Sequence, residues 1–288
     1  MRAVLKHELY SNFTNLTGYV FGAFILLFAG IFTLVYNLDG MLTNFEYAVA
    51  SMTIVYLVAI PILTMRILAE ERKQKTDQLL YSLPLSMGQV ILGKFAALLV
   101  MLLLPLAIIG LYPLVLRVYG NVYLPASYST LLAFFLLGAA LIAIGMFISS
   151  VTESQAVAAG ICFVIMLLNY FLSDLSGYVG TSALASFVAL AVVVLVLGGV
   201  IRLMTKSSFA ALLVCTVLEA VLVGMYLINA AVFENLLPQV LAELSLFERF
   251  YGFADGVFDI AGIVYFLSVI GVFLFLSVQS MEKRRWSA

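Results

Sequence analysis

The chain has 288 residues, of which 65% are hydrophobic and 10% are charged, and its mean hydropathy is +1.17. Soluble domains are about 45–50% apolar and about 25% charged, so these values exclude a soluble enzyme, a disordered chain, a collagen-like chain and a disulfide scaffold. The formal net charge of −1 gives no indication of nucleic-acid binding. The class that remains is a polytopic membrane protein surrounded by a lipid bilayer.

The first segment, residues 1–15, is predicted to be a short amphipathic helix that lies on the membrane surface. Its apolar residues fall near one helical face, and they are Val4, Leu5, Leu9, Tyr10 and Phe13. No small-residue cleavage pattern follows this segment. The sequence therefore predicts an interfacial helix and not a cleaved signal peptide.

Long apolar runs follow the interfacial segment. A helix needs about 20 mostly apolar residues to cross the bilayer core, and continuous runs of this length indicate helices rather than β-barrel strands. The predicted spans are roughly 16–36, 48–69, 90–116, 128–151, 155–172, 183–203, 208–233 and 260–280. The sequence thus predicts an all-α membrane bundle of about eight transmembrane helices, one transmembrane domain over 1–288. Six or seven spans would result if one pair were re-entrant.

The basic residues predict the orientation of the chain. If the N-terminus is cytoplasmic and eight spans follow, 12 of the 14 basic residues lie inside, and only Arg117 and Arg249 lie outside. Because basic residues favour cytoplasmic loops, we expect both termini to be cytoplasmic.

Catalytic and metal-binding chemistry is not indicated by the sequence. The single histidine, His7, lies before the first span, so the spans contain no histidine for a catalytic triad or a metal site. Residues 88–95 nearly match a phosphate-binding loop, but Phe95 replaces the hydroxyl that would hold Mg²⁺ and the run opens an apolar helix. We therefore expect no catalytic residue, no metal and no bound nucleotide.

A few polar or helix-breaking residues lie inside the predicted spans. Glu219 lies at mid-depth of the seventh span, where a charge is costly. It either handles substrate or protons, or it has a packing role and pairs with a hydroxyl such as that of Thr216. Pro61, Pro105 and Pro113 lie in the second and third spans and are either pivots or tolerated membrane prolines.

The most informative polar segment is the loop of residues 70–89, between the second and third spans. Its first half is densely charged, and its second half is amphipathic and rich in leucine. Pro84 ends one helix, and Ser86 can cap the next, which begins near Met87. This pattern fits docking onto a cytoplasmic protein, with charges for orientation and leucines for a pocket. A solvated loop that rests its leucines on the bilayer would show the same pattern.

Residues 234–259 form the second long polar interruption. This outer segment is predicted to contain one or two short helices with an aromatic-rich apolar surface, interrupted by acids and by Pro238. The apolar residues are Leu236, Leu237, Val240, Leu241, Leu244, Phe247, Phe250, Tyr251 and Phe253.

Several motifs along the chain resemble those of ABC-2 type transporter permeases. The resemblance covers residues 6–13, 18–21, 70–73, 76–86, 93–95, 148–155, 245–250, 256–259 and 283–286. It is nearest to the branch that acts in gliding motility and in nitrous-oxide-reductase maturation. Asp77 departs from the loop pattern of many relatives, which leaves the charge pairing of the loop open but not the family.

The resemblance implies that the chain is the membrane subunit of an ABC exporter and not an enzyme. Two copies of a separate ATPase subunit would use ATP and Mg, while this chain would bind no cofactor. It would pair with a second permease subunit, identical or related, in a bacterial plasma membrane. An ion-gradient-driven secondary transporter is the alternative, which is less favoured because no internal repeat and only one intramembrane acid are found.

The resemblance also implies roles for particular residues. The loop after the second helix would be a coupling helix that docks the ATPase, and the turn between helices four and five would be a second contact. The predicted docking residues are Glu70, Glu71, Arg72, Lys73, Thr76, Asp77, Leu79, Leu80, Leu83, Pro84, Ser149, Thr152 and Glu153. The outer segment would be a re-entrant lid that includes Phe247, Phe250 and Asp259, and an interfacial helix on the outer leaflet is the alternative.

Overall fold

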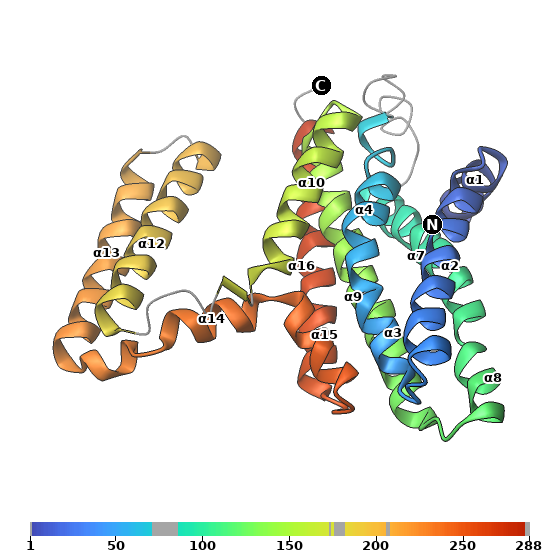
Figure 1. The fold of residues 1–288 in the computed structure, drawn as a ribbon. Helices are drawn as coiled ribbons and strands as arrows, with labels where there is room; N and C mark the ends of the chain where they lie inside the picture. Colours follow the sequence, from blue (N-terminus) through green and yellow to red (C-terminus); the bar gives the residue numbers. More distant parts are fainter. Residues whose placement is uncertain (1, 71–85, 173, 176–181, 206–207, 286–288) are drawn as a thin grey trace. The chain divides into compact units, whose positions relative to one another are not determined.

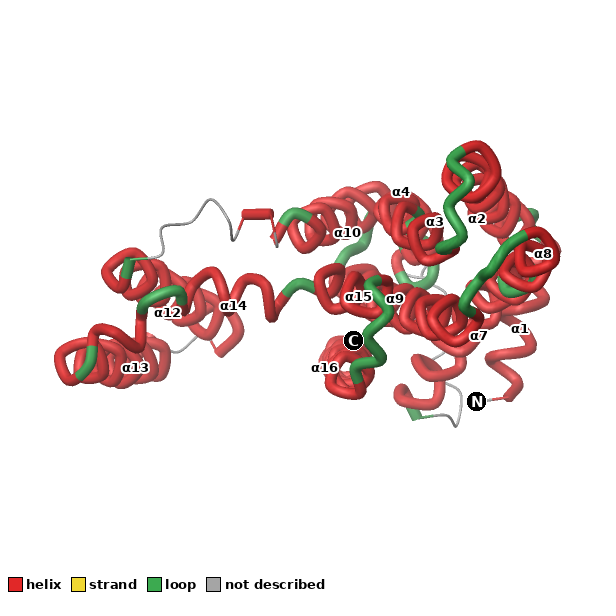
Figure 2. The backbone as a smooth tube through the Cα atoms, turned by 60° about the horizontal axis from the view of Figure 1, so that its bottom comes forward, coloured by secondary structure: helices red, strands yellow, loops and turns green. Residues whose placement is uncertain are grey.

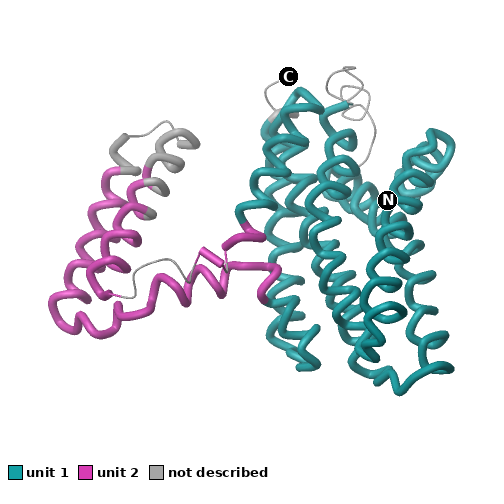
Figure 3. Tube along the Cα trace, viewed as in Figure 1, with its two compact units in different colours: residues 1–168, 249–288 teal, residues 169–248 magenta. Residues whose placement is uncertain are grey.

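The computed structural model describes residues 2–70, 86–172, 174–175, 182–205 and 208–285. Regular secondary structure in these ranges is entirely helical, which confirms the all-α membrane bundle. Two compact units are present (Figure 3). The first comprises Met1–Leu168 and Arg249–Ala288, and the second comprises Asn169–Glu248. The prediction of one permease domain over the whole chain stays a prediction.

The first unit contains the helices at both ends of the chain (Figure 1). They are α1 (Arg2–Thr14), α2 (Thr17–Thr33) with its π-helical continuation η1 (Leu34–Asp39), α3 (Phe45–Ser51), α4 (Thr53–Thr64), α7 (Met87–Ile109), α8 (Tyr112–Tyr119), α9 (Leu124–Val151), most of α10 (Gln155–Tyr170), the end of α15 (Leu246–Ala254), and α16 (Ile260–Arg285). Each predicted span of this unit therefore corresponds to a helix or to a pair of consecutive helices.

Helix α9 is the centre of the first unit and packs against α3, α4, α7 and α16 (Figures 1 and 2). Two glycines let α4 and α7 approach it closely. A Cβ at Gly138 would lie 2.7 Å from Leu102 Cδ2, and a Cβ at Gly145 would lie 2.8 Å from Thr64 Cβ. Small residues at helix contacts are a usual means of close packing in membranes. Tyr56 of α4 stacks on Phe134 of α9 with ring centroids 4.2 Å apart, so this contact is also specific in its geometry.

The second unit contains a helical hairpin and one short helix. Its elements are α12 (Ala183–Thr205), α13 (Ser208–Ile228), the 3₁₀ turn η2 (Ala230–Phe233) and α14 (Leu236–Leu244). Helices α12 and α13 pack side by side. Phe187, Tyr226 and Phe233 form an aromatic cluster at the end of the hairpin. The chain turns by 116° between α13 and the segment of η2 and α14, so this part is either a broken span or a re-entrant loop.

When helices are judged by length and composition, fewer of them qualify as membrane spans than the eight that the sequence predicts. Among the described residues, four helices are long and apolar enough to cross a membrane, and up to six spans result if each bent pair counts as one. The prediction of eight therefore stays a prediction. Helices α3 and α4 are bent by 44° at Met52, and not at Pro61, which lies inside α4. Pro113 lies in the first turn of α8, where a missing N–H costs nothing.

Candidate functional site

The candidate site is the end of the first unit where residues 71–85 connect α4 to α7. We call this region the loop end, and we define it by residues 64–70, 86–94 and 148–155. Helix α1 also reaches it and packs against α7 (Figure 1). Ser86 caps α7, because its side chain accepts a hydrogen bond from the backbone N–H of Gln89 at 3.3 Å. The predicted cap is thereby confirmed.

A buried serine closes a break in the chain at the end of α4. Helix α4 ends at Thr64, and residues 65–68 form a turn. The N–H groups of Leu68 and Ala69 donate to Ser149 Oγ of α9 at 3.2 and 3.1 Å, and Ser149 Oγ lies 3.3 Å from the carbonyl oxygen of Met65, to which it can donate. Leu68, Ala69 and Ser149 are all buried. One hydroxyl thus satisfies main-chain groups that would otherwise be costly to bury.

A buried ion pair forms the second connection at the loop end. Lys94 of α7 is 1% exposed, and its ammonium group donates to Glu8 Oε1 of α1 at 2.7 Å and to the carbonyl oxygen of Ile67 at 3.3 Å. A buried ammonium group is tolerated only when it is paired and hydrogen-bonded. Lys94 therefore holds together α1, α7 and the 65–68 turn. Sequence analysis did not identify this pair, although a lysine inside an apolar run was a sign of it.

The predicted docking residues differ in where they lie. Glu70 is partly exposed and pairs with Arg66 at 3.0 Å, and Glu153 is exposed in the turn between α9 and α10. Thr152 is partly exposed, and its hydroxyl donates to the carbonyl oxygen of Ile148 at 2.9 Å. The remaining predicted docking residues of the loop lie outside the described residues, and they are Glu71, Arg72, Lys73, Thr76, Asp77, Leu79, Leu80, Leu83 and Pro84. Their docking role stays a prediction.

The predicted lid residues are held by packing and capping contacts. In the first unit, Phe250 is buried and packs on Phe134 with ring centroids 5.9 Å apart. Asp259 caps α16 by accepting from the N–H groups of Ala261 and Gly262, each at 2.9 Å, and lies 3.7 Å from Arg249 Nη1. In the second unit, the buried ring of Phe247 meets that of Tyr170 edge-to-face at 5.0 Å. A lid function stays a prediction.

Glu219 lies on α13 of the second unit. Its Oε1 atom is buried and has no hydrogen-bond partner among the described residues. The hydroxyl of Thr216, the partner suggested by the sequence, donates to the carbonyl oxygen of Leu213 at 3.0 Å. Both roles of Glu219 stay predictions.

The comparisons with known proteins agree with the motif resemblance. A family model described as "ABC-2 family transporter protein" matches residues 2–278, which is nearly the whole chain. A search of curated proteins gives no match. The proposed nearest branch within the family stays a prediction. Together with the apolar helices, the family match identifies a multi-pass membrane protein of a transport system that includes an ATPase. The chain belongs to the ABC-2 family of transporter proteins and is a permease subunit of an ABC transporter.

Proposed function

We propose that this permease exports its cargo by coupling ATP hydrolysis in a separate ATPase subunit to movement of its helices. Two ATPase copies bind ATP and Mg, and two permease subunits, identical or related, form the membrane path. The complex lies in a bacterial plasma membrane with both termini of the permease cytoplasmic. The family membership and the excess of basic residues on the predicted inner side support this proposal.

The ATPase docks on residues 70–89, with Thr152 and Glu153 as the second contact. The observation that carries this proposal is the bonding of Ser149, because it ties the chain just before the docking loop to the end of α9. A force on the loop therefore acts on the central helix of the bundle as well as on α4. Lys94 passes the same force to α1 and α7 through its bonds to Ile67 and Glu8.

The coupling step is a shift between two conformations of the permease. The ATP-bound, closed ATPase pair binds the outward-open permease more tightly than the inward-open permease. ATP therefore shifts the equilibrium towards the outward-open conformation through the docking loops. Buried hydrogen bonds suit this transfer because they are directional, while apolar contacts between helices in lipid permit sliding.

Co-purification of the permease with its ATPase tests the docking. Glu71→Ala, Arg72→Ala or the double change Leu79→Asp and Leu80→Asp should lower the amount of ATPase recovered while the permease still inserts. Arg117→Ala is the matched control, because Arg117 is exposed on α8 at the other end of the first unit. An unchanged yield of complex in the loop variants would contradict docking at this loop.

A further inference from the structure

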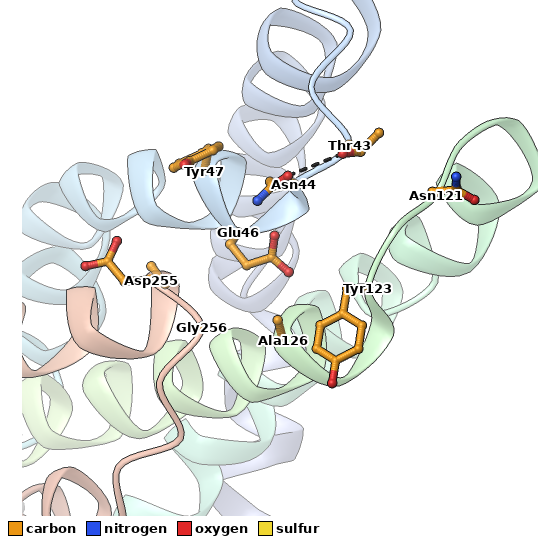
Figure 4. A pocket seen from close by; sticks show the side chains of 10 residues that line it. Thr43, Asn44, Glu46, Tyr47, Asn121, Tyr123, Ala126, Asp255 and Gly256 are labelled. Carbon is orange, nitrogen blue, oxygen red and sulfur yellow. Dashed lines mark hydrogen bonds between the residues drawn. The ribbon is translucent and has the colours of Figure 1, made fainter.

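A polar pocket of about 310 Å³ lies at the end of the first unit opposite the loop end (Figure 4). Its walls come from the start of α3, the connection of α8 to α9, and the turn between α15 and α16. Glu46 and Asp255 provide two carboxylates, and Asn44 and Asn121 provide amide groups. The pocket has room for about ten water molecules, which is the size of a small polar headgroup.

Glu46 is the buried charged group of this pocket. It is 5% exposed, and its Oε1 atom accepts from the hydroxyl of Ser127 at 2.8 Å. Its Oε2 atom has no hydrogen-bond partner among the residues that the structure describes. Figure 4 shows the carboxylate extending from α3 towards the first residues of α9, near Ala126. A buried carboxylate thus lines the pocket with one oxygen uncommitted.

No basic side chain of the described part of the chain pairs with Glu46 or Asp255. Two cations lie at this end of the unit. Arg117 is exposed on α8, and Arg249 lies 3.7 Å from Asp259 and over the ring of Tyr265. Burying a carboxylate without a compensating positive charge is costly, so a cation from outside the chain would stabilise Glu46 in this pocket.

The wall beside Glu46 is already formed. The side-chain amide of Asn37 donates to the carbonyl oxygens of Leu42 and Asn44 at 2.8 and 3.3 Å, and Asn37 is buried. These bonds hold the segment that leads into α3. A pocket that is formed before binding loses little free energy to rearrangement.

We infer that this pocket binds a small ammonium group, with Glu46 as its anionic anchor. An ammonium group donates several N–H bonds, and the pocket supplies matching acceptors in the carboxylates, the amide oxygens and the hydroxyl groups of its wall. Charge-assisted hydrogen bonds of this kind are stronger than neutral ones. The ammonium group belongs either to a soluble amine or to a lipid headgroup, because both present the same chemistry to Glu46.

A thermal-shift titration of the full chain in nanodiscs tests the site, with ethanolamine as the probe and ethylene glycol as its neutral analogue. Ethanolamine should stabilise the chain saturably in phosphatidylglycerol nanodiscs, and ethylene glycol should not. Glu46→Gln should weaken ethanolamine binding about 10- to 100-fold, because it removes a charged hydrogen bond. Asp39→Asn is the control, since Asp39 is an exposed acid in η1 outside the pocket, and it should bind as the wild type does.

The lipid arm of the experiment distinguishes the two sources of the amine. If a lipid headgroup fills the site, added ethanolamine does not change the unfolding temperature in phosphatidylethanolamine nanodiscs. If the ligand is a soluble amine, added ethanolamine raises the unfolding temperature equally in both lipids. Either result supports the site when the phosphatidylglycerol arm is positive. The inference is overturned if ethanolamine gives no saturable shift there, if ethylene glycol or Ca²⁺ binds equally well, or if Glu46→Gln leaves the affinity unchanged.

Stability without ligand provides a second readout. Glu46→Gln keeps an oxygen for Ser127 and removes an unpaired buried charge, so the unfolding temperature of the free chain should stay constant or rise. A lower unfolding temperature would assign the charge a structural role and would contradict the inference. The measurement needs neither nucleotide nor ATPase, so its failure is distinct from a failure of the proposed coupling.

Discussion

Ser149→Ala is expected to weaken the connection between α4 and α9. The change removes the oxygen that accepts from Leu68 and Ala69, and neither N–H bonds to a backbone carbonyl among the described residues. Each buried N–H left unpaired costs about 1–3 kcal/mol, and relaxation of the turn recovers part of this. We expect the free energy of unfolding to fall by about 2 kcal/mol, which lowers the unfolding temperature by roughly 4–8 °C in a chain of this size class.

Hydrogen exchange measured by mass spectrometry locates the effect. Peptides that contain residues 65–70 should exchange faster in Ser149→Ala than in the wild type, because the turn opens more often. Ser129→Ala is the matched control on the same helix, since the Ser129 hydroxyl is buried without a hydrogen-bond partner among the described residues. That variant should be as stable as the wild type. Equal exchange of the 65–70 peptides in both variants would refute the role given to Ser149.

Three further changes test other parts of the structure. Glu8→Gln leaves Lys94 buried without its anion and should lower the free energy of unfolding by about 3 kcal/mol. In a double-mutant cycle, adding Lys94→Met should restore most of the lost free energy of unfolding. Gly145→Ala places a methyl group against α4 and should cost about 1–3 kcal/mol in thermal unfolding, while Gly160→Ala, which meets open space, should cost nothing. Glu219→Gln should leave transport-coupled ATPase activity nearly intact if Glu219 packs, and a large loss would show a functional role.

The helices were predictable from the sequence because lipid demands long apolar runs. The fourth predicted span, 128–151, ends at the last residue of α9, Leu124–Val151, and the outer segment contains the short helices α14 and α15. The breaks in the helices were not predictable. Met52 is neither glycine nor proline, yet α3 and α4 are bent there by 44°. At this break the Thr53 hydroxyl donates to the carbonyl oxygen of Ala50 at 2.7 Å and lies 3.2 Å from the Tyr251 hydroxyl, a contact that periodicity does not report.

The hydrogen bonds at the loop end were not predictable from the sequence. The motifs indicated the loop end, and the resemblance assigned Ser149 to ATPase docking, but the structure places its hydroxyl on main-chain groups of residues 65–69. The partners of Ser149 lie about eighty residues away in sequence, and Lys94 and Glu8 are separated by 86. Such pairs are invisible to periodicity, which reports only which face of a helix is apolar.

The distribution of polar contacts bears on how the proposed coupling would move this apolar bundle. Between helices in lipid, apolar contacts are non-directional and do not fix the register of one helix against another. In the first unit, directional contacts lie near both ends, with Ser149 and Lys94 at the loop end and Glu46 with Ser127 at the other. Between them, the Tyr56 hydroxyl of α4 donates to the carbonyl oxygen of Phe134 in α9 at 3.2 Å. The middle of α9 is packed by Gly138 and Gly145 against its neighbours. In the proposed coupling, a force applied at the loop end would move the connected helix ends together, and the close-packed centre would transmit that movement along α9.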